Sequence, residues 1–332
     1  MKFHPSLIFS LSRYIMRTRL SGSRRAPLVL MLEPLHACNL ACRGCGRIRE
    51  YKGTMREQLS LEQCIRAIDE AGTPVVTITG GEPLMHKELV ALVAAAVARK
   101  KHLYLCTNGI LLEEFLPKIQ PSPNLNINVS LDGMEETHDR LRNAKGVFTK
   151  AVAGIAEAKR RGFRVVINTT VYYDTGNAEI ISLFELLAKL RVDGILVAPG
   201  FSYFESGQEI FLTRERVHEK FRSLESAFAR FPIISTPLYL DFLRGKRDFR
   251  CSPWGNPTRN VRGWKSPCYL ITDAHYGSFR EMIDKTPWEK YGPGKDPRCA
   301  NCMMHCGYEP TIAYETGNRL RDIATMVKWN LS

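Results

Sequence analysis

Three cysteines near the N-terminus are the feature that most constrains this chain. Cys38, Cys42 and Cys45 form a Cys-x3-Cys-x2-Cys pattern just after an apolar stretch that favours a strand. Structural zinc normally takes four protein ligands, whereas three cysteines can hold a [4Fe-4S] cluster and leave one iron open to a small molecule. The spacing therefore predicts such a cluster. A zinc knuckle or three unrelated thiols are the alternatives.

The ten cysteines and the charge also indicate a compartment and partners. Most of the cysteines gather at residues 38–45 and 299–306, and we expect no secretory leader, so they predict metal ligands in a reducing cytoplasm. The formal net charge of +13 allows an anionic partner, either nucleic acid or an acidic membrane surface. Because no run of about 20 apolar residues is present, we expect no membrane-spanning segment.

The first 25 residues form a basic segment that contains no acidic side chain. Apolar residues recur in it at helical spacing, and arginines occupy other positions. This pattern predicts an amphipathic helix that either lies in a bilayer interface near anionic headgroups or packs on the folded domain. A signal peptide is disfavoured because Ser10, Ser12 and Arg13 interrupt the apolar run. We expect peripheral association with the inner face of a bacterial membrane.

Residues 26–200 alternate between short apolar runs and amphipathic stretches. Nearly continuous β-branched runs are typical of parallel strands that are buried on both faces. We expect strands over 28–33, 75–79, 102–106, 125–131, 164–171 and 194–198, and helices near 60–72, 86–100, 111–119, 147–162 and 177–191. The first helix opens on a capping box, Ser60 to Gln63. Six such units predict an α/β fold, a partial (β/α)6 barrel with its active site at the carboxyl ends of the strands.

The alternation stops at about residue 200, and residues 201–332 are predicted to form a C-terminal extension. Helices are expected near 213–230 and 237–245. A cysteine-bearing region rich in proline, glycine and tryptophan follows up to about residue 310, and the tail over 311–332 is weakly helical. The chain therefore divides into a basic segment over 1–25, a core over 26–200 and this extension.

Polar and glycine-rich motifs follow the predicted strands, as an active site in a barrel requires. The motif of Gly80, Gly81, Glu82 and Pro83 follows the second strand, and its glycines let the backbone approach a ligand closely. The other candidates are Thr107, Asn108 and Gly109 after the third strand, Ser130 and Asp132 at the end of the fourth, Asn168 within the fifth, and Val197, Ala198 and Pro199 at the end of the sixth. An ordinary turn is the alternative for the glycine motif, and a core amide for Asn168.

Together, these motifs resemble those of the radical S-adenosylmethionine (SAM) superfamily. The resemblance implies that the open iron chelates SAM, whose reductive cleavage gives a 5'-deoxyadenosyl radical. It assigns the methionyl ammonium to Gly80, Gly81, Glu82 and Pro83, the ribose to Ser130 and Asp132, and the ribose or carboxylate to Asn168. The adenine would lie at the end of the sixth strand, at Val197, Ala198 and Pro199. The superfamily usually places an aromatic residue before the third cysteine, where this chain has Gly44. Arg43 and Arg47 either tune the cluster or are solvated.

The C-terminal cysteines resemble the auxiliary-cluster extension of many radical SAM enzymes. Cys251, Gly263 and Cys268 match its first half, and Cys299, Cys302 and Cys306 supply the second. The resemblance implies a second [4Fe-4S] cluster on Cys251, Cys268, Cys299 and Cys302, with Cys306 or His305 as a substitute ligand. A structural zinc site made from the same residues is the alternative.

Over its whole length the chain resembles the adenosylhopane-forming enzymes of hopanoid biosynthesis (HpnH). The segments that carry this resemblance are CNLACRGCGR, TGGEPL, LCTNG, SLDG and the CxxC-x3-CGYE ending. It implies a transferase in which the adenosyl radical adds to the terminal alkene of a C30 hopene, diploptene, and one hydrogen atom quenches the product radical. SAM would be consumed as a co-substrate, and a flavodoxin or ferredoxin would supply electrons.

Cys106, at the end of the third strand, is our candidate for the hydrogen-atom donor. A small buried hydrophobic residue is the alternative for Cys106, and it is our interpretation of Cys64. We expect an apolar substrate pocket, with Phe201, Tyr203 and Phe204 as candidate lining.

Two other functions compete with this assignment. Peptide-modifying radical SAM enzymes also carry cysteine-rich extensions, but 25 N-terminal residues are too few to build a leader-peptide module. A non-catalytic iron–sulfur or zinc protein that binds nucleic acid would need a basic stripe with stacking aromatic residues. Since the positive charge is scattered along the chain, we expect no nucleic-acid partner.

Overall fold

The computed structural model describes residues 2–23, 25–203 and 210–331. In this part of the chain, nine strands form one sheet in the order β6-β5-β4-β3-β2-β1-β7-β8-β9. The first six are β1 (Val29–Leu32), β2 (Val75–Ile78), β3 (His102–Thr107), β4 (Leu125–Ser130), β5 (Arg164–Val171) and β6 (Gly194–Pro199). All neighbours among them pair in parallel. The predicted strands are confirmed to within one residue at each end, and the sheet is an open, partial barrel.

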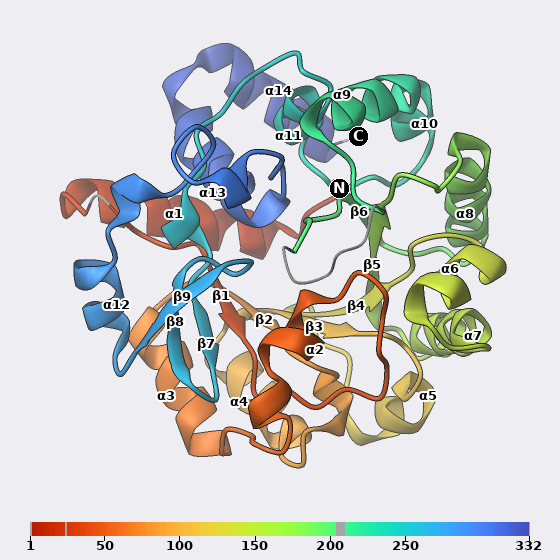
Figure 1. Ribbon diagram of the computed structural model, residues 1–332, viewed down its shortest axis with the longest axis horizontal. Coiled ribbons are helices and arrows are strands. Elements are labelled where there is room, and N and C mark those ends of the chain that lie inside the picture. Colours follow the sequence, from red (N-terminus) through yellow and green to blue (C-terminus); the bar gives the residue numbers. More distant parts are fainter. Residues whose placement is uncertain (1, 24, 204–209, 332) are drawn as a thin grey trace.

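Helices in an arc cover the outer face of these six strands (Figure 1). They are α3 (Leu61–Ala71), α4 (Leu89–Ala98), α5 (Leu112–Phe115), α7 (Val147–Arg160) and α8 (Asn177–Lys189). The capping box that opens α3 is confirmed: the Gln63 N–H donates to the Ser60 hydroxyl, and the Ser60 N–H donates to the Gln63 side chain. The helix expected over 111–119 consists of α5 and a 3-10 turn at Leu116–Lys118.

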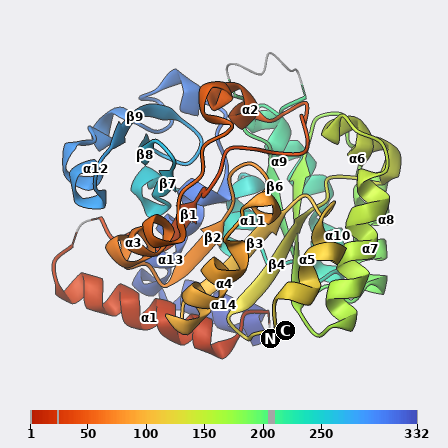
Figure 2. The same ribbon diagram turned by 90° about the horizontal axis from the view of Figure 1, so that it is seen from below.

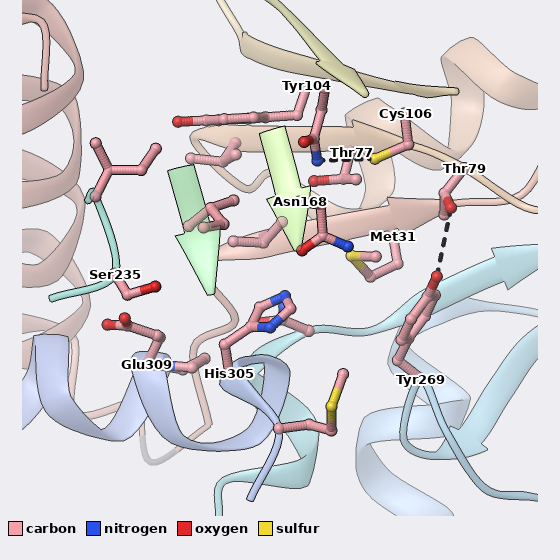
Figure 3. A pocket seen from close by; sticks show the side chains of 18 of the residues that line it. Met31, Thr77, Thr79, Tyr104, Cys106, Asn168, Ser235, Tyr269, His305 and Glu309 are labelled. Atoms are coloured by element: carbon pink, nitrogen blue, oxygen red, sulfur yellow. Dashed lines mark hydrogen bonds between the residues drawn. The ribbon is translucent and has the colours of Figure 1, made fainter. Parts of the chain in front are cut away.

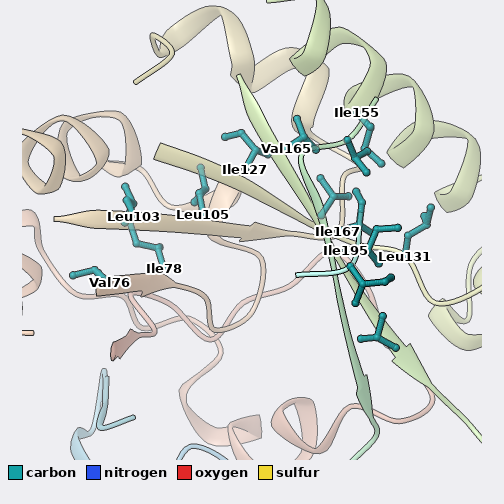
Figure 4. Close-up of a cluster of buried hydrophobic side chains, with 14 of the residues drawn as sticks. Val76, Ile78, Leu103, Leu105, Ile127, Leu131, Ile155, Val165, Ile167 and Ile195 are labelled. Atoms are coloured by element: carbon teal, nitrogen blue, oxygen red, sulfur yellow. The ribbon is translucent and has the colours of Figure 1, made fainter. Parts of the chain in front are cut away.

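The main hydrophobic core lies between the sheet and these outer helices (Figure 4). Side chains alternate between the two faces of a strand, so Leu103 and Leu105 of β3 are fully buried in this core. Tyr104 and Cys106 of the same strand line the interior of the partial barrel instead. The apolar residues of the strands thus anchor the helices, and the alternate positions remain available for a site. Cys64 is fully buried in this core, as predicted.

The C-terminal extension continues the sheet of the core, which the sequence did not predict. Strand β7 (Thr258–Asn260) pairs in parallel with β1, and β8 (Gly263–Pro267) and β9 (Thr272–Tyr276) follow in antiparallel pairing. Strands are usually recognised by buried apolar residues, but here Asn260 and Lys265 are buried. Both contact the hydroxyl of Tyr51, so a polar network takes the place of the apolar signal.

The other helices are mostly polar or lie toward the C-terminus, and several of them were not predicted from the sequence. They include α2 (Gly46–Glu50), α6 (Glu135–Arg142) and α12 (Phe279–Lys285). The helix expected over 213–230 is divided at Leu224 into α9 (Arg214–Ser223) and α10 (Glu225–Arg230), and the next is α11 (Pro237–Leu243). The tail is more helical than expected, because α13 (His305–Glu315) and α14 (Leu320–Leu331) occupy most of it.

The predicted N-terminal helix is confirmed as α1 (Pro5–Leu20) and crosses the amino ends of the strands (Figure 2). The Ser10 hydroxyl lies 3.3 Å from Nε2 of His102, the first residue of β3. At its start, the Lys2 N–H donates to the Asn330 carbonyl at 3.0 Å. The helix therefore packs on the domain, beside α14. None of the helices in the described ranges has the length and apolar character needed to cross a bilayer.

Candidate active site

The loop between β1 and α2 carries Cys38, Cys42 and Cys45 at the carboxyl end of β1. All three cysteines lie outside disulfide bonds and are partly exposed. Burial raises the pKa of Cys38 to about 12, and the Glu82 carboxylate and the other two thiols add to this shift, so the three sulfurs lie within electrostatic reach of one another. The predicted cysteine set is thus brought together in space.

The arrangement of the thiols is looser than a single metal ion requires. Among the described residues, no three cysteine, histidine or acidic side chains are placed to hold one metal ion. Zinc draws its sulfur ligands to about 2.3 Å. A cluster of four irons accepts more widely separated cysteines, so the loop fits a cluster better than a mononuclear site.

The glycine motif after β2 packs its backbone directly against the cysteine loop. The Gly81 N–H donates to the Leu35 carbonyl at 3.1 Å, and the Glu82 N–H donates to the Ala37 carbonyl at 2.8 Å. A Cβ on Gly81 would overlap the Ala37 carbonyl, and one on Gly80, whose φ is +112°, would lie 2.5 Å from the Leu35 oxygen. Both glycines are therefore required by this close approach.

The Glu82 carboxylate, 1% exposed, joins the ends of β2 and β3. Its Oε1 accepts from the Thr107 hydroxyl at 2.8 Å and the Leu84 N–H at 3.1 Å, and its Oε2 accepts from the Asn108 N–H at 2.8 Å. Burial raises the pKa of Glu82 to about 7. The Asn108 side chain in turn donates to that of Asn39 at 2.7 Å, so the third motif also contacts the cysteine loop.

Asp132, to which the resemblance assigns the ribose, faces a cation. Its carboxylate pairs with Arg142 at 2.6 Å and accepts from the Thr170 N–H at 2.8 Å. The Arg142 guanidinium also lies 3.8 Å from the Cys42 sulfur. Arg142 was not among the predicted site residues, because α6, which carries it, is too polar to give a helical signal.

One cavity of about 1530 Å³ runs from the cysteine loop through the barrel interior to α1. Its lining includes the three cysteines and most of the predicted SAM contacts: Gly80, Gly81, Glu82, Pro83, Ser130, Asp132 and Asn168. Ala198 does not line it and is 3% exposed, whereas Leu196 and Val197 of the same strand do line it. Ala198 is therefore not placed to contact a ligand in this cavity, whereas Leu196 and Val197 are.

Cys106 faces this cavity from β3 (Figure 3). The Asn128 side chain lies 3.3 Å from its sulfur. Burial raises the pKa of Cys106 to about 12, so the group is a neutral thiol at physiological pH. Its orientation, which the sequence left open, is toward the cavity.

A polar group on α13 lies across the cavity from the strands (Figure 3). Glu309 accepts from the Thr236 N–H at 3.2 Å and from its hydroxyl at 2.9 Å, and burial raises the pKa of Glu309 to about 7. Burial lowers the pKa of His305 to about 4, so this imidazole is neutral. His305 lines the large cavity, which makes it a poor substitute ligand for the C-terminal cysteines.

The space beside Gly44, where the superfamily usually has an aromatic residue, is already filled by other side chains. A Cβ on Gly44 would lie 3.2 Å from Phe211 and 3.5 Å from Tyr172, whose rings are 5.9 Å apart. A Cβ on Gly46 would overlap the ring of Tyr203. Aromatic side chains from distant parts of the chain thus surround the third cysteine. Of the candidate pocket residues, Phe201 and Tyr203 line the cavity, and Phe204 lies outside the described residues.

The C-terminal cysteines converge on a second, small cavity of about 30 Å³. Its lining includes Cys251, Cys268, Cys299, Cys302 and Cys306. The segments around β8 and α13 thus bring together all five candidate ligands. Which four of them bind a metal stays a prediction.

Arg47 connects the two cysteine regions and is not solvated. It forms a buried ion pair with Glu33 of the β1 end. Its guanidinium lies 4.0 Å from the ring centroid of Tyr269, beside Cys268. The Tyr269 hydroxyl is 3.3 Å from that of Thr79, which follows β2. The extension therefore packs directly on the candidate site.

Replacing Gly81 by alanine tests the contact between the motif and the cysteine loop. The added methyl group collides with the Ala37 carbonyl, and such overpacking costs about 1–3 kcal/mol. We expect Gly81→Ala to incorporate clearly less iron during anaerobic reconstitution than wild type. Gly176→Ala is the control, because a Cβ there meets nothing within 4 Å. Equal iron content in the two variants would contradict this interpretation.

Because of Glu309, we expect the unfolding free energy of the protein to depend on pH. Its pKa is raised in the folded protein, so its stabilising effect is complete below the unfolded value of about 4.3 and is lost as the pH rises through about 7. From about pH 5 to about pH 8, the unfolding free energy of wild type should fall by roughly 1–3 kcal/mol more than that of Glu309→Gln. Denaturant titrations of both proteins measure this difference, and identical pH profiles would refute it.

Comparison with known proteins agrees with this geometry. The sequence model of the radical SAM superfamily matches residues 32–187, and a model described as a domain of unknown function (DUF3463) matches residues 195–326. The Fe-coproporphyrin III synthase of Methanosarcina barkeri is 30% identical over 58% of this chain and 53% of that protein. The GTP 3',8-cyclase of Xanthomonas campestris pv. campestris is 32% identical over 47% of this chain and 49% of that protein. The chain thus spans about half the length of these curated relatives.

Two solved structures share the fold. SuiB of Streptococcus suis bound to its precursor peptide SuiA superposes with a TM-score of 0.67 at 14% identity, over 91% of this chain and 76% of that one. The AdoMet-bound anSMEcpe superposes with a TM-score of 0.60 at 16% identity, over 90% of this chain and 98% of that one. Residues 32–187, which carry the cysteine loop and the strand-end motifs packed against it, match the radical SAM superfamily.

Proposed function

We propose that the protein is a radical SAM enzyme that adds the 5'-deoxyadenosyl radical to the alkene of a C30 hopene, diploptene, to form adenosylhopane. The observation that carries the proposal is the cavity of about 1530 Å³, which joins the cysteine loop to an apolar wall. Pockets for drug-sized ligands usually occupy about 300–1,000 Å³. A cavity of this size can hold SAM and a pentacyclic hydrocarbon together.

The cysteine-loop end of the cavity would hold the cofactors. Cys38, Cys42 and Cys45 would bind a [4Fe-4S] cluster, which supplies the electron for SAM cleavage. Glu82 retains acceptor capacity on Oε2, which accepts a single hydrogen bond within the described structure, and can receive an ammonium group. Arg142, oriented by Asp132, places a positive charge beside the Cys42 sulfur and compensates for negative charge there.

The opposite end of the cavity would hold the hydrocarbon. Leu7, Leu11 and Ile15 of α1 line it together with Met326 of α14. Arg47 and Arg142, the basic residues that line the cavity near the cysteine loop, are paired with Glu33 and Asp132. The lining therefore favours a large neutral substrate.

Cys106 would complete the reaction as a hydrogen-atom donor. Radical addition forms a carbon–carbon bond at C5', opens the alkene π bond and leaves a tertiary carbon radical. The Cys106 S–H bond then supplies one hydrogen atom, and the raised pKa keeps this thiol protonated. The resulting thiyl radical takes up one electron and one proton, with the electron from a reduced flavodoxin or ferredoxin.

We also infer a second metal centre in the C-terminal extension. The support is the small cavity lined by five cysteines. Because no three described ligand side chains are placed to hold one metal ion, this set suits a [4Fe-4S] cluster better than the alternative, a zinc ion. Cys251, Cys268, Cys299 and Cys302 are the proposed ligands. Metal analysis of the purified protein, compared with a variant lacking Cys268, distinguishes iron from zinc.

A second candidate function is modification of a peptide. Thr77, Tyr104, Asn168 and Glu309 also line the cavity, and such polar groups suit a peptide better than a hydrocarbon. The relatives include haem-related synthases, which would suggest a porphyrin substrate. A coproporphyrin suits the cavity less well, because its carboxylates would require basic side chains that are not already paired.

The decisive experiment is an anaerobic reaction of reconstituted protein with SAM, dithionite and diploptene, analysed by mass spectrometry. We expect a product with the mass of diploptene plus one 5'-deoxyadenosyl group and one hydrogen atom. A variant with Cys38 replaced by alanine should form neither this product nor 5'-deoxyadenosine. Formation of 5'-deoxyadenosine alone by wild type would reject diploptene as substrate and favour peptides.

Cys106→Ala separates radical addition from its quenching. We expect this variant to cleave SAM but to accumulate unsaturated or oxidised adduct at the expense of reduced product, because the carbon radical finds no S–H bond. Cys64→Ala is the matched control, since Cys64 is buried in the outer core. An unchanged product distribution and rate in Cys106→Ala would remove this residue from the mechanism.

A further inference from the structure

Exposed apolar side chains concentrate on two helices at the amino ends of the strands. Of the eleven large hydrophobic residues that are exposed in the described part of the chain, eight belong to α1 or α14. They are Ile8, Phe9, Met16 and Leu20 on α1, and Leu320, Ile323, Val327 and Leu331 on α14. Such a concentration marks an interaction surface, because soluble proteins rarely expose large contiguous apolar patches.

The spacing of these residues gives each helix one outward apolar stripe. Phe9, Met16 and Leu20 are seven and four residues apart, which places them on one side of α1. The four exposed residues of α14 follow at intervals of three, four and four, which also corresponds to one face. We call these two stripes together the α1–α14 surface.

The two helices lie side by side and run in opposite directions (Figure 2). Phe3, just before α1, packs on Trp329 near the end of α14, with ring centroids 5.3 Å apart. At the other end of α1, Arg19 donates to the Tyr314 carbonyl and lies 3.5 Å from the Asn318 side chain, which precedes α14. The stripes are thus neighbours at the same end of the molecule.

The charge around the α1–α14 surface is positive. Arg13 and Arg17 are exposed on α1, and Arg321 and Lys328 on α14. Helix α1 contains no acidic residue. The one acid of α14, Asp322, is buried and pairs with Arg247 at 2.6 Å. Within the two helices, no carboxylate therefore offsets the basic side chains.

The large cavity opens within this surface. Seven of the eight exposed apolar residues of α1 and α14 also line the cavity, all except Leu320. Side chains that face both solvent and the cavity mark an opening between α1 and α14. Its apolar wall continues inward over Leu7, Leu11 and Ile15 toward the strands that carry Cys106.

We propose that the α1–α14 surface docks on an anionic lipid bilayer and that the gap between the two helices is a portal for an apolar substrate. Apolar stripes with basic flanks suit the headgroup region, where each basic residue contributes about 1 kcal/mol. A portal that faces the bilayer lets a hydrocarbon enter without passing through water. Exposing the hydrocarbon to water would cost free energy in proportion to its apolar surface area. The portal rests on the proposed function, whereas the docking does not.

Cosedimentation of the cluster-loaded protein with vesicles tests the docking. We expect binding to phosphatidylglycerol-containing vesicles that is at least about tenfold tighter than to phosphatidylcholine alone and weakens with salt. Met16→Glu and Leu320→Glu should each weaken it severalfold. Val90→Glu, on α4, is the matched control and should bind like wild type. Equal affinity for both kinds of vesicle, or no binding to either, would overturn the docking. A soluble dimer that Leu320→Glu dissociates would also overturn it and would identify the surface as an interface between copies of this chain.

The portal is tested by delivering the substrate in two ways. Leu320 lies outside the cavity lining, so Leu320→Glu should match wild type when diploptene is dispersed in detergent. With diploptene embedded in anionic vesicles, the same variant should be severalfold slower than wild type. Equal rates with vesicles would overturn the portal. Absence of product from wild type in both formats, with vesicle binding intact, would instead reject the proposed substrate.

Discussion

The site depends on the contact between two backbones, that of Gly80 and Gly81 and that of the segment leading into Cys38. Two hydrogen bonds from the glycine motif hold the start of the cysteine loop, and the Glu82 carboxylate extends the connection to the end of β3. Side chains larger than hydrogen cannot be accommodated between the two backbones. Three sequence motifs that are up to about 70 residues apart thereby become one surface, on which the position of each determines that of the others.

The sequence predicted the parallel core well because each strand is buried on both faces, which requires β-branched and apolar runs. It failed where burial is polar: β7 and β8 bury Asn260 and Lys265, which both contact the hydroxyl of Tyr51, more than 200 residues earlier in the chain. Local motifs predicted the cysteines and the glycine turn. The place of Arg142 beside Cys42 could not be predicted, since it depends on a backbone hydrogen bond between Arg43 and Leu141.

The position of helix α1 also could not be predicted from local sequence. Helical spacing predicted that α1 is amphipathic and left its location open, with a bilayer and the folded domain as alternatives. The structure shows that the helix packs on the domain while keeping an apolar stripe exposed. Its neighbour α14 comes from the other end of the chain, and no local pattern indicates that the two helices meet.

The pairing of β1 with both β2 and β7 bears on how the chain folds during synthesis. Strand β2 follows within 50 residues, whereas β7 begins more than 200 residues later, at Thr258. Until that segment leaves the ribosome, the strand that ends at the cysteine loop has one unsatisfied edge, and such edges invite pairing with other chains. The first motif to be synthesised is therefore among the last to be fully enclosed.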